Sequence, residues 1–120
     1  MNTLERWKTI TTYKEWCFDG KYEVSNWGNI RNKETKQPLA TYSNNKGQGY
    51  LKTKIFDKEK KRRILYVHRL VATYYVGIPN EEGLEVNHKD GNVRNNSYTN
   101  LEWLTHKENI QHYVEGRKAV

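Results

Sequence analysis

Residues 86–112 read VNHKDGNVRNNSYTNLEWLTHKENIQH, and this stretch decides the fold of the C-terminal half. A short strand around Val86 is followed by the turn residues DGN, and the segment NLEW then alternates apolar and polar side chains as a partner strand would. Thr105 and Glu108 have the spacing of a capping box, which predicts a helix that runs to about Gly116. The stretch therefore predicts a strand, a long turn, a second strand and a helix.

The same residues include a candidate reactive centre. His88 ends the first strand, and a neutral histidine can take a proton from water at physiological pH. Asn87 precedes it, and because neighbouring strand residues point to opposite faces, we expect a bulge or a strand end here. Asn109 lies one turn inside the predicted helix, on the same face as His112, and Ile110 and Val114 are expected to form the other, buried stripe. Amide oxygens are acceptable ligands for hard divalent cations.

Each of these residues also has a simpler interpretation. An isolated histidine in a hairpin is usually a hydrogen-bonding surface residue. The asparagines at 92, 95 and 96 have the chemistry of turns, and Asn100 can be a local brace between side chain and backbone. His68 begins an apolar helix and is expected to be structural. No single residue favours the chemical interpretation by itself. The spacing of these residues taken together does favour it.

Upstream of this stretch the pattern predicts a small antiparallel sheet and one helix. Residues 1–20 hold aromatic side chains without a clear period and are expected to form an irregular lead-in. Strands are predicted on both sides of a tight turn that contains Gly28 and Asn29. Further strands are predicted at 50–55 and 64–67, with a polar turn at 58–63 between them, and an amphipathic helix from Val67 to about Gly77. The predicted class is α+β, with an N-terminal β-rich region at 1–66 and a helix plus a ββα unit at 67–120.

Composition narrows the class of partner. The 120 residues carry a formal net charge of +7, which favours a polyanion such as nucleic acid; a basic protein without an anionic partner is the alternative. Cys17 is the single cysteine, so neither a disulfide nor a thiolate zinc cluster can form within the chain. The apolar runs are too short for a membrane span and no secretory signal is apparent, so we expect an intracellular, cytoplasmic location.

Cationic side chains gather on the predicted strands and turns. They would neutralise phosphates and position a duplex, with an affinity that falls as salt rises. A solvated charged turn is the alternative for residues 58–63. The candidate DNA-binding residues are Arg31, Lys33, Lys52, Lys54, Lys60, Lys61, Arg62, Arg63, Lys89, Arg94 and Lys107.

The spacing of VNHKDGNVRNN, NLEWLTHKEN and IQH resembles the HNH endonuclease motif of phage and intron-encoded homing endonucleases. YEVSNWGNIRN, GYLKTKIF and VHRLVATYY resemble the nuclease-associated modular domain that often precedes it. The resemblance implies that His88 is the general base and that Asn100 is the middle residue of the motif, which braces the loop and orients the histidine. It further implies that Asn109 and Asn87 are metal ligands, with Asn87 standing where related enzymes carry Asp.

The resemblance also implies an activity. The chain would be a metal-dependent DNA endonuclease that leaves 5′-phosphate and 3′-hydroxyl ends, and one site per chain predicts nicking. Asparagine ligands favour Mg²⁺ or Mn²⁺ over Zn²⁺. Double-stranded DNA would be the partner, with a homodimer where both strands are cut, and the protein would act in the host cell of a phage or intron. The alternative is a DNA-binding module that keeps the ββα fold without catalysis.

Overall fold

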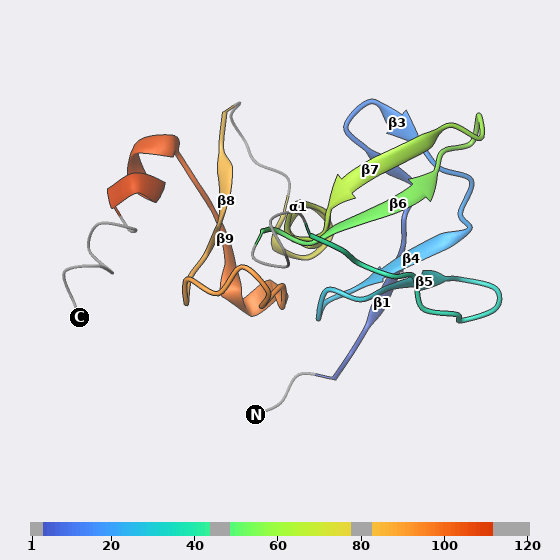
Figure 1. Ribbon diagram of the computed structural model, residues 1–120, viewed down its shortest axis with the longest axis horizontal. Helices are drawn as coiled ribbons and strands as arrows, with labels where there is room; N and C mark the ends of the chain where they lie inside the picture. Colours follow the sequence, from blue (N-terminus) through green and yellow to red (C-terminus); the bar gives the residue numbers. More distant parts are fainter. Residues whose placement is uncertain (1–3, 44–48, 78–82, 112–120) are drawn as a thin grey trace.

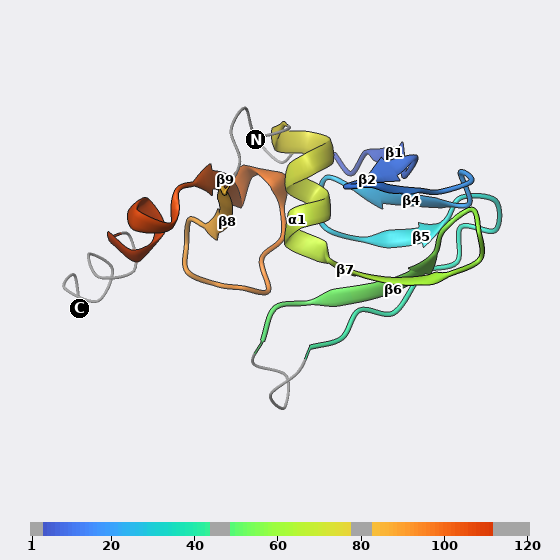
Figure 2. The ribbon, with the colours of Figure 1, turned by 90° about the horizontal axis from the view of Figure 1, so that it is seen from above.

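The computed structural model describes residues 4–43, 49–77 and 83–111. Small antiparallel sheets occupy one end of the molecule, and a two-stranded hairpin and a helical turn occupy the other (Figure 1). Helix α1 (Val67–Val71) stands between the two ends, as the view from above shows (Figure 2). The predicted α+β class is confirmed.

The N-terminal segment is more regular than its sequence predicts. β1 (Trp7–Thr9) pairs antiparallel with β4 (Tyr22–Ser25), which in turn pairs with β5 (Ile30–Asn32). β2 (Thr12–Tyr13) and β3 (Trp16–Cys17) form a separate short hairpin. The expectation of an irregular lead-in over residues 1–20 is therefore wrong for its described part. These strands are too short to show a period, and β1 exists because β4 supplies its hydrogen-bonding partner.

The predicted turn between β4 and β5 is confirmed. Gly28 has a φ of 94°, a left-handed conformation that glycine adopts without steric cost, whereas Asn29 keeps a negative φ. The Ser25 hydroxyl accepts hydrogen bonds from the backbone N–H groups of Trp27 (3.2 Å) and Asn29 (3.0 Å). The turn is thus closed by its own side chains as well as by the strands.

A second hairpin follows, built from β6 (Lys52–Phe56) and β7 (Arg62–Tyr66). The predicted alternation of β6 is confirmed, since Thr53 and Ile55 are buried while Lys52 and Lys54, which alternate with them, face outward. Arg62 and Arg63 were expected in the turn but lie in β7. The strand begins earlier because these residues pair in register with Phe56 and Ile55.

The predicted amphipathic helix is confirmed, and it changes form half-way. α1 continues into the π-helical segment η2 (Ala72–Val76), which ends at Gly77. Two tyrosines of η2 reach back to the N-terminal strands. The hydroxyl of Tyr74 donates to Thr12 O (2.7 Å), and that of Tyr75 to Val24 O (2.7 Å). The helix is thereby fastened to the sheet beneath it.

The C-terminal unit has the predicted order. β8 (Glu85–His88) pairs with β9 (Leu101–Leu104) after a loop and the 3₁₀ turn η3 (Tyr98–Asn100). The capping box is confirmed, since Thr105 N donates to Glu108 Oε1 (3.0 Å) and Glu108 N to Thr105 Oγ1 (3.2 Å). The helix is described from His106 to Gln111, so its predicted end at Gly116 lies outside the described residues.

One feature of the helix differs from expectation. Ile110 was predicted to belong to a buried stripe together with Val114, but its side chain is 51% exposed. The helical turn follows the hairpin at the end of the molecule, away from the core residues around α1 (Figure 2). Val114 lies outside the described residues.

A single apolar cluster links the two ends of the chain. It contains the inward side chains of the N-terminal sheets, one face of α1, and a residue from each strand of the β8–β9 hairpin. Its members are Ile10, Tyr13, Phe18, Val24, Ile30, Ile55, Leu65, Val67, Leu70, Val71, Ala72, Val86 and Leu101. Within the described ranges, no helix is long and apolar enough to cross a membrane.

Candidate active site

His88 is the last residue of β8, and its imidazole is 4% exposed. Its Nε2 lies 2.8 Å from Oδ1 of Asn96, which is also buried. The strands keep a regular register here, with Asn87 opposite Glu102 and His88 opposite Leu101. A bulge or a strand end was expected at Asn87 and His88. The structure has a strand end here and no bulge.

Two further rings lie close to this histidine. The His68 ring centroid is 5.2 Å from that of His88, and Tyr50 stacks on both, at 4.7 Å from His68 and 5.8 Å from His88. Burial, followed by the nearby His88 and Arg69, lowers the pKa of His68 to about 3. His68 was expected to be structural, and the fold places it directly beside the candidate base as a neutral ring.

Asn100 closes the loop that follows His88. Its Nδ2 donates to Asp90 Oδ1 and to the backbone oxygen of Asn95, both at 2.9 Å, while its Oδ1 accepts from Asp90 N (3.1 Å). Its backbone oxygen accepts from Lys89 N (2.8 Å). Hydrogen bonds from Asn95, Asn92 and Asn100 hold the pKa of Asp90 below its usual range. This is the geometry that a loop brace requires.

The two proposed metal ligands come from different elements. Asn87 is buried, and its Nδ2 lies 3.4 Å from the Glu102 carboxylate on the paired strand. Asn109 is half-buried in the helical turn, which a hydrogen bond between His106 Nδ1 and Glu85 Oε1 (2.8 Å) ties to the start of β8. His112, which was expected on the face of Asn109, lies outside the described residues.

The donor chemistry fits a hard cation. Among the described side chains, no group of three His, Cys, Asp or Glu could hold a metal. The side-chain oxygens beside Asn87 are its own amide oxygen and the carboxylate of Glu102, ligand types that Mg²⁺ and Mn²⁺ accept and that Zn²⁺ sites rarely use. Glu102 is the charged group that the register places beside Asn87.

Two of the candidate DNA-binding arginines are engaged within the fold. Arg31 is ion-paired with buried Glu23 (2.6 Å) and lies over the Trp7 ring at 3.7 Å. Arg63 is paired with Asp57 (2.9 Å). These interactions lower the pKa of each carboxyl, although burial of the carboxyls acts in the opposite direction. Both arginines therefore have a structural role of their own.

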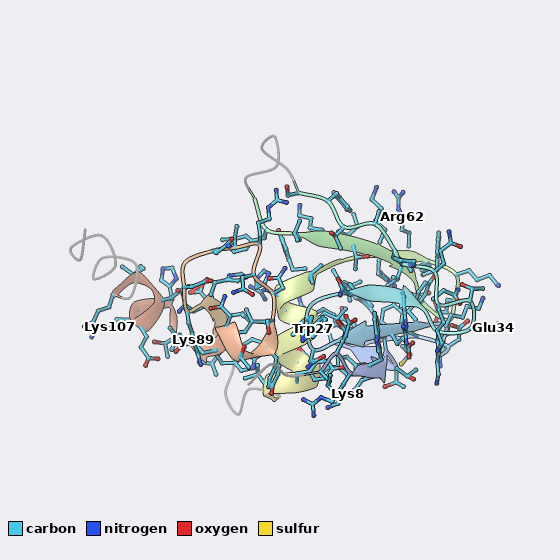
Figure 3. The ribbon with its side chains drawn as sticks, turned by 90° about the horizontal axis from the view of Figure 1, so that it is seen from below. Lys8, Trp27, Glu34, Arg62, Lys89 and Lys107 are labelled. Carbon is cyan, nitrogen blue, oxygen red and sulfur yellow. The ribbon has the colours of Figure 1, made fainter. Side chains whose placement is uncertain are left out.

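The remaining cations divide into two groups. Lys52, Lys54 and Arg62 face outward from the β6–β7 ribbon, and between them are exposed Phe56, Ile64 and Tyr66. The second group is spread over turns, loops and the helix, as the labels of Lys89 and Lys107 indicate (Figure 3). Its members are Lys33, which bonds Thr9; Lys61, beside Glu59; Arg94, which bonds Ser43; and the exposed Lys60, Lys89 and Lys107.

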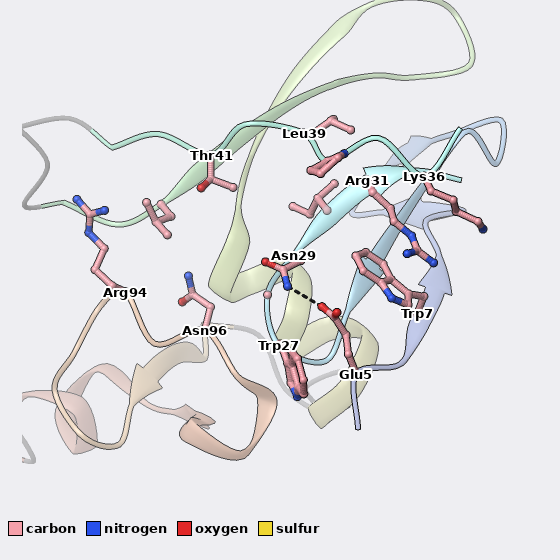
Figure 4. Close-up of a pocket in the computed structure, with 14 residues that line it drawn as sticks. Glu5, Trp7, Trp27, Asn29, Arg31, Lys36, Leu39, Thr41, Arg94 and Asn96 are labelled. Carbon is pink, nitrogen blue, oxygen red and sulfur yellow. Dashed lines mark hydrogen bonds between the residues drawn. The ribbon is translucent and has the colours of Figure 1, made fainter. Parts of the chain in front are cut away.

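A groove of about 470 Å³ lies between the N-terminal sheet and the loop after β8 (Figure 4). Trp7, Trp27 and Arg31 line one side, and Arg94 and Asn96 line the other. Asn96 therefore faces this groove and also bonds His88. The two halves of the chain meet at this residue.

Sequence reasoning missed three residues of the site. Asn96 was assigned to turn chemistry, and nothing in the sequence separates it from Asn92 or Asn95. Glu102 became relevant only through its register opposite Asn87. Tyr50 was assigned to a strand, whereas it precedes β6 and stacks on the candidate base. The proximity of Tyr50 and Asn96 to His88 arises from tertiary packing, which spacing alone does not encode.

Comparison with protein families gives two adjoining matches. A model described as HNH endonuclease matches residues 65–111, and one described as NUMOD4 motif matches residues 5–68. The chain is 39% identical over 108 residues to the DNA endonuclease I-HmuI of Bacillus phage SP01, covering 90% of this chain and 57% of that protein. It is 38% identical over 105 residues to an uncharacterised HNH endonuclease of Acanthamoeba polyphaga mimivirus, covering 88% of this chain and 30% of that protein.

The fold is similar to a solved structure as well. The structure described as DNA binding and cleavage by the HNH homing endonuclease I-HmuI superposes with a TM-score of 0.75 at 36% identity. The similarity covers 96% of this chain and 60% of that one. The chain thus spans about a third to just over half of the length of the first curated relatives it matches.

Proposed function

Because the chain belongs to the HNH endonucleases that carry a NUMOD4 motif, we propose that it is a metal-dependent endonuclease that nicks double-stranded DNA. The observation that supports this most strongly is the constellation around His88. A histidine at a strand end, held by Asn96 and followed by a loop that Asn100 closes, has the arrangement of an oriented general base.

In this proposal His88 accepts a proton from the water that attacks the phosphorus. The bond between phosphorus and the 3′ oxygen breaks, and the departing oxygen takes a proton from solvent water, which leaves a 5′-phosphate and a 3′-hydroxyl. Asn100 keeps the loop closed so that the imidazole stays at the end of β8. Tyr50 and His68 lie against the imidazole and restrict rotation of the ring. One His88 per chain supports a nick, and a double-strand break would need two chains.

Asn87 and Asn109 would hold the divalent cation, with Glu102 adding a negative charge beside Asn87. A bound Mg²⁺ or Mn²⁺ would supply counter-charge for the phosphate and for the leaving oxygen. The role of the protein is to present amide and carboxylate oxygens from β8, β9 and the helix. Of the groups proposed to surround the cation, only Glu102 is charged. The DNA phosphate would therefore contribute to the affinity of the site for metal.

The β6–β7 ribbon is the proposed DNA-binding surface. Its outward face alternates cations with exposed Phe56, Ile64 and Tyr66, a combination suited to phosphates and to groove walls. The Tyr66 ring lies 5.5 Å from that of His68, so the ribbon is continuous with the rings around the candidate base.

Nicking of supercoiled plasmid tests the proposal. The chain is incubated with Mg²⁺, with Mn²⁺ and with EDTA, beside His88→Ala and the exposed control Thr99→Ala. We expect metal-dependent open-circular product from the wild type and the control, and none from His88→Ala, which should keep its affinity for DNA. Undiminished nicking by His88→Ala would contradict the assignment of the base.

The alternative function is a DNA-binding module without catalysis. Asn87 favours it, because a neutral amide stands where an acidic ligand would bind the cation more tightly. Absence of metal-dependent product under every condition, together with retained DNA binding, would establish this alternative. Asn87→Asp is then the informative variant, since the added carboxylate should restore nicking if weak metal binding was the cause.

A further inference from the structure

The turn of residues 25–29 and the loop that carries Asn96 are packed directly together. Tyr98 N donates to Asn26 O (2.9 Å), so the backbones of the two segments are joined. Asn26 is fully buried and is itself held by Arg6 N, which donates to its Oδ1 (2.6 Å). The N-terminal turn therefore offers a fixed surface to the loop that follows His88.

Gly28 is the point of closest approach. A Cβ built on Gly28 would lie 2.8 Å from Cβ of Asn96 and 3.2 Å from its backbone oxygen. The first separation is shorter than side chains tolerate, so only glycine permits Asn96 to sit where it does. Gly28 also has the left-handed φ of 94° that places its backbone there.

Asn96 in turn determines which ring nitrogen of His88 carries the hydrogen. An amide oxygen only accepts hydrogen bonds, so Nε2 of His88 carries the hydrogen in the 2.8 Å contact. The lone pair of the neutral ring is then on Nδ1. Both side chains are buried, at 4% exposure each, so water competes weakly for this hydrogen bond.

We propose that Asn96 is a positioning residue for His88, and that the Gly28 turn of the NUMOD4 motif holds Asn96 in place. The N-terminal motif is then part of the support of the active site and not only an attachment for DNA. This inference rests on the proposed function for its catalytic consequence. The hydrogen bond itself can be measured independently of activity.

The activity test compares three variants in metal-dependent nicking. Asn96→Leu removes the acceptor, and we expect kcat to fall by about 10- to 100-fold with KM unchanged. Asn96→Asp keeps an acceptor oxygen and should recover most of the lost rate. Thr99→Ala, an exposed change in the same loop, is the matched control and should match the wild type. A wild-type kcat in Asn96→Leu would overturn the positioning role.

The structural test is the Nε2–H proton of His88 in a ¹H–¹⁵N spectrum of the imidazole rings. A hydrogen-bonded, buried proton exchanges slowly and should be visible in the wild type and absent in Asn96→Leu. A wild-type spectrum that shows Nδ1 protonated, or no protected Nε2–H, would overturn the inference. A protein with the protected proton but without metal-dependent nicking would instead overturn the proposed function.

The contribution of Gly28 is tested with Gly28→Ala against Gly20→Ala. Both glycines have a positive φ, but a Cβ at Gly20 meets only Thr9 Cγ2 at 3.8 Å, so this control carries the backbone strain without the clash. We expect Gly28→Ala alone to lose the protected proton and the rate. Wild-type signals in a folded Gly28→Ala would remove the turn from the inference. If that chain unfolds while Gly20→Ala folds, the clash with Asn96 is the cause, and the Asn96 variants decide the positioning role.

Discussion

At the scale of single residues, His68 is a buried histidine whose Nδ1 has no hydrogen-bond partner in the structure. Its pKa of about 3 lies below the ordinary value of 6.5, because burial and then His88 and Arg69 disfavour the charged ring. Tyr50 and Tyr66 are its other ring neighbours. The folded protein therefore keeps His68 neutral in a pH range where the unfolded chain protonates it.

The sign of the pH dependence follows from this difference. Below about pH 6.5 the unfolded state binds a proton that the folded state does not, so stability falls as the pH drops, by up to about 1.4 kcal/mol per pH unit. We expect His68→Phe, which keeps a ring, to reduce this loss between pH 6.5 and 5. Urea denaturation at several pH values measures it, with exposed His106→Gln as the control. An unchanged acid sensitivity in His68→Phe would contradict the assignment.

Carboxyl groups contribute to the pH dependence of stability at lower pH, so their effect can be separated from that of His68. Glu23, Asp57, Asp90 and Glu108 have pKa values held below their ordinary 4.5 or 3.8. Their stabilising contribution is complete above these ordinary values and is lost as the pH falls through the lowered ones. The window between pH 6.5 and 5 therefore reports on histidines.

At the scale of elements, the β6–β7 ribbon should account for part of the salt dependence of DNA binding. Each phosphate contact that is removed lowers the slope of log K against log salt by about 0.9. We expect Lys54→Ala and Arg62→Ala each to weaken binding and reduce the slope by about 1. The control is Lys21→Ala, an exposed lysine outside the ribbon beside Asp19 (3.6 Å). Fluorescence anisotropy with a labelled duplex at several salt concentrations gives the slopes, and equal slopes for all variants would exclude this surface.

The elements also show what sequence patterns can predict. The helix at Val67 and the Thr105 capping box were predicted because each depends on residues a few positions apart, and the β8–β9 hairpin because alternation and turn residues mark its strands. β1 was missed because a strand of three residues shows no alternation that would predict its pairing with β4. The ion pairs of Arg31 and Arg63 were missed because spacing does not say which carboxylate the fold brings beside each guanidinium. The choice of Asn96 among several similar asparagines was missed because it depends on tertiary packing. Local spacing identified the candidate base, whereas its supporting residues depend on the tertiary fold.

At the scale of the whole molecule, the apolar cluster joins the two regions that were predicted from the sequence, residues 1–66 and residues 67–120. Leu70 of α1 is fully buried within it, between residues of the N-terminal sheets and Val86 and Leu101 of the C-terminal hairpin. Tyr98 N and Asn26 O add a backbone hydrogen bond across the same division. The division between 1–66 and 67–120 remains a prediction from sequence, and the shared core predicts that the two parts do not unfold separately.

The substitution Leu70→Ala tests this cooperativity. Removing a fully buried leucine side chain leaves a cavity and should lower the free energy of unfolding by about 2–5 kcal/mol. Because the core is shared, tryptophan fluorescence and the slowly exchanging amides of β4 and of β9 should lose protection at the same urea concentration. Exposed Thr99→Ala is the control and should leave the transition unchanged. Separate transitions for the β4 and β9 amides would show that the two regions are independent domains. The contacts from Gly28 through Asn96 to His88 would then have to form without a common core.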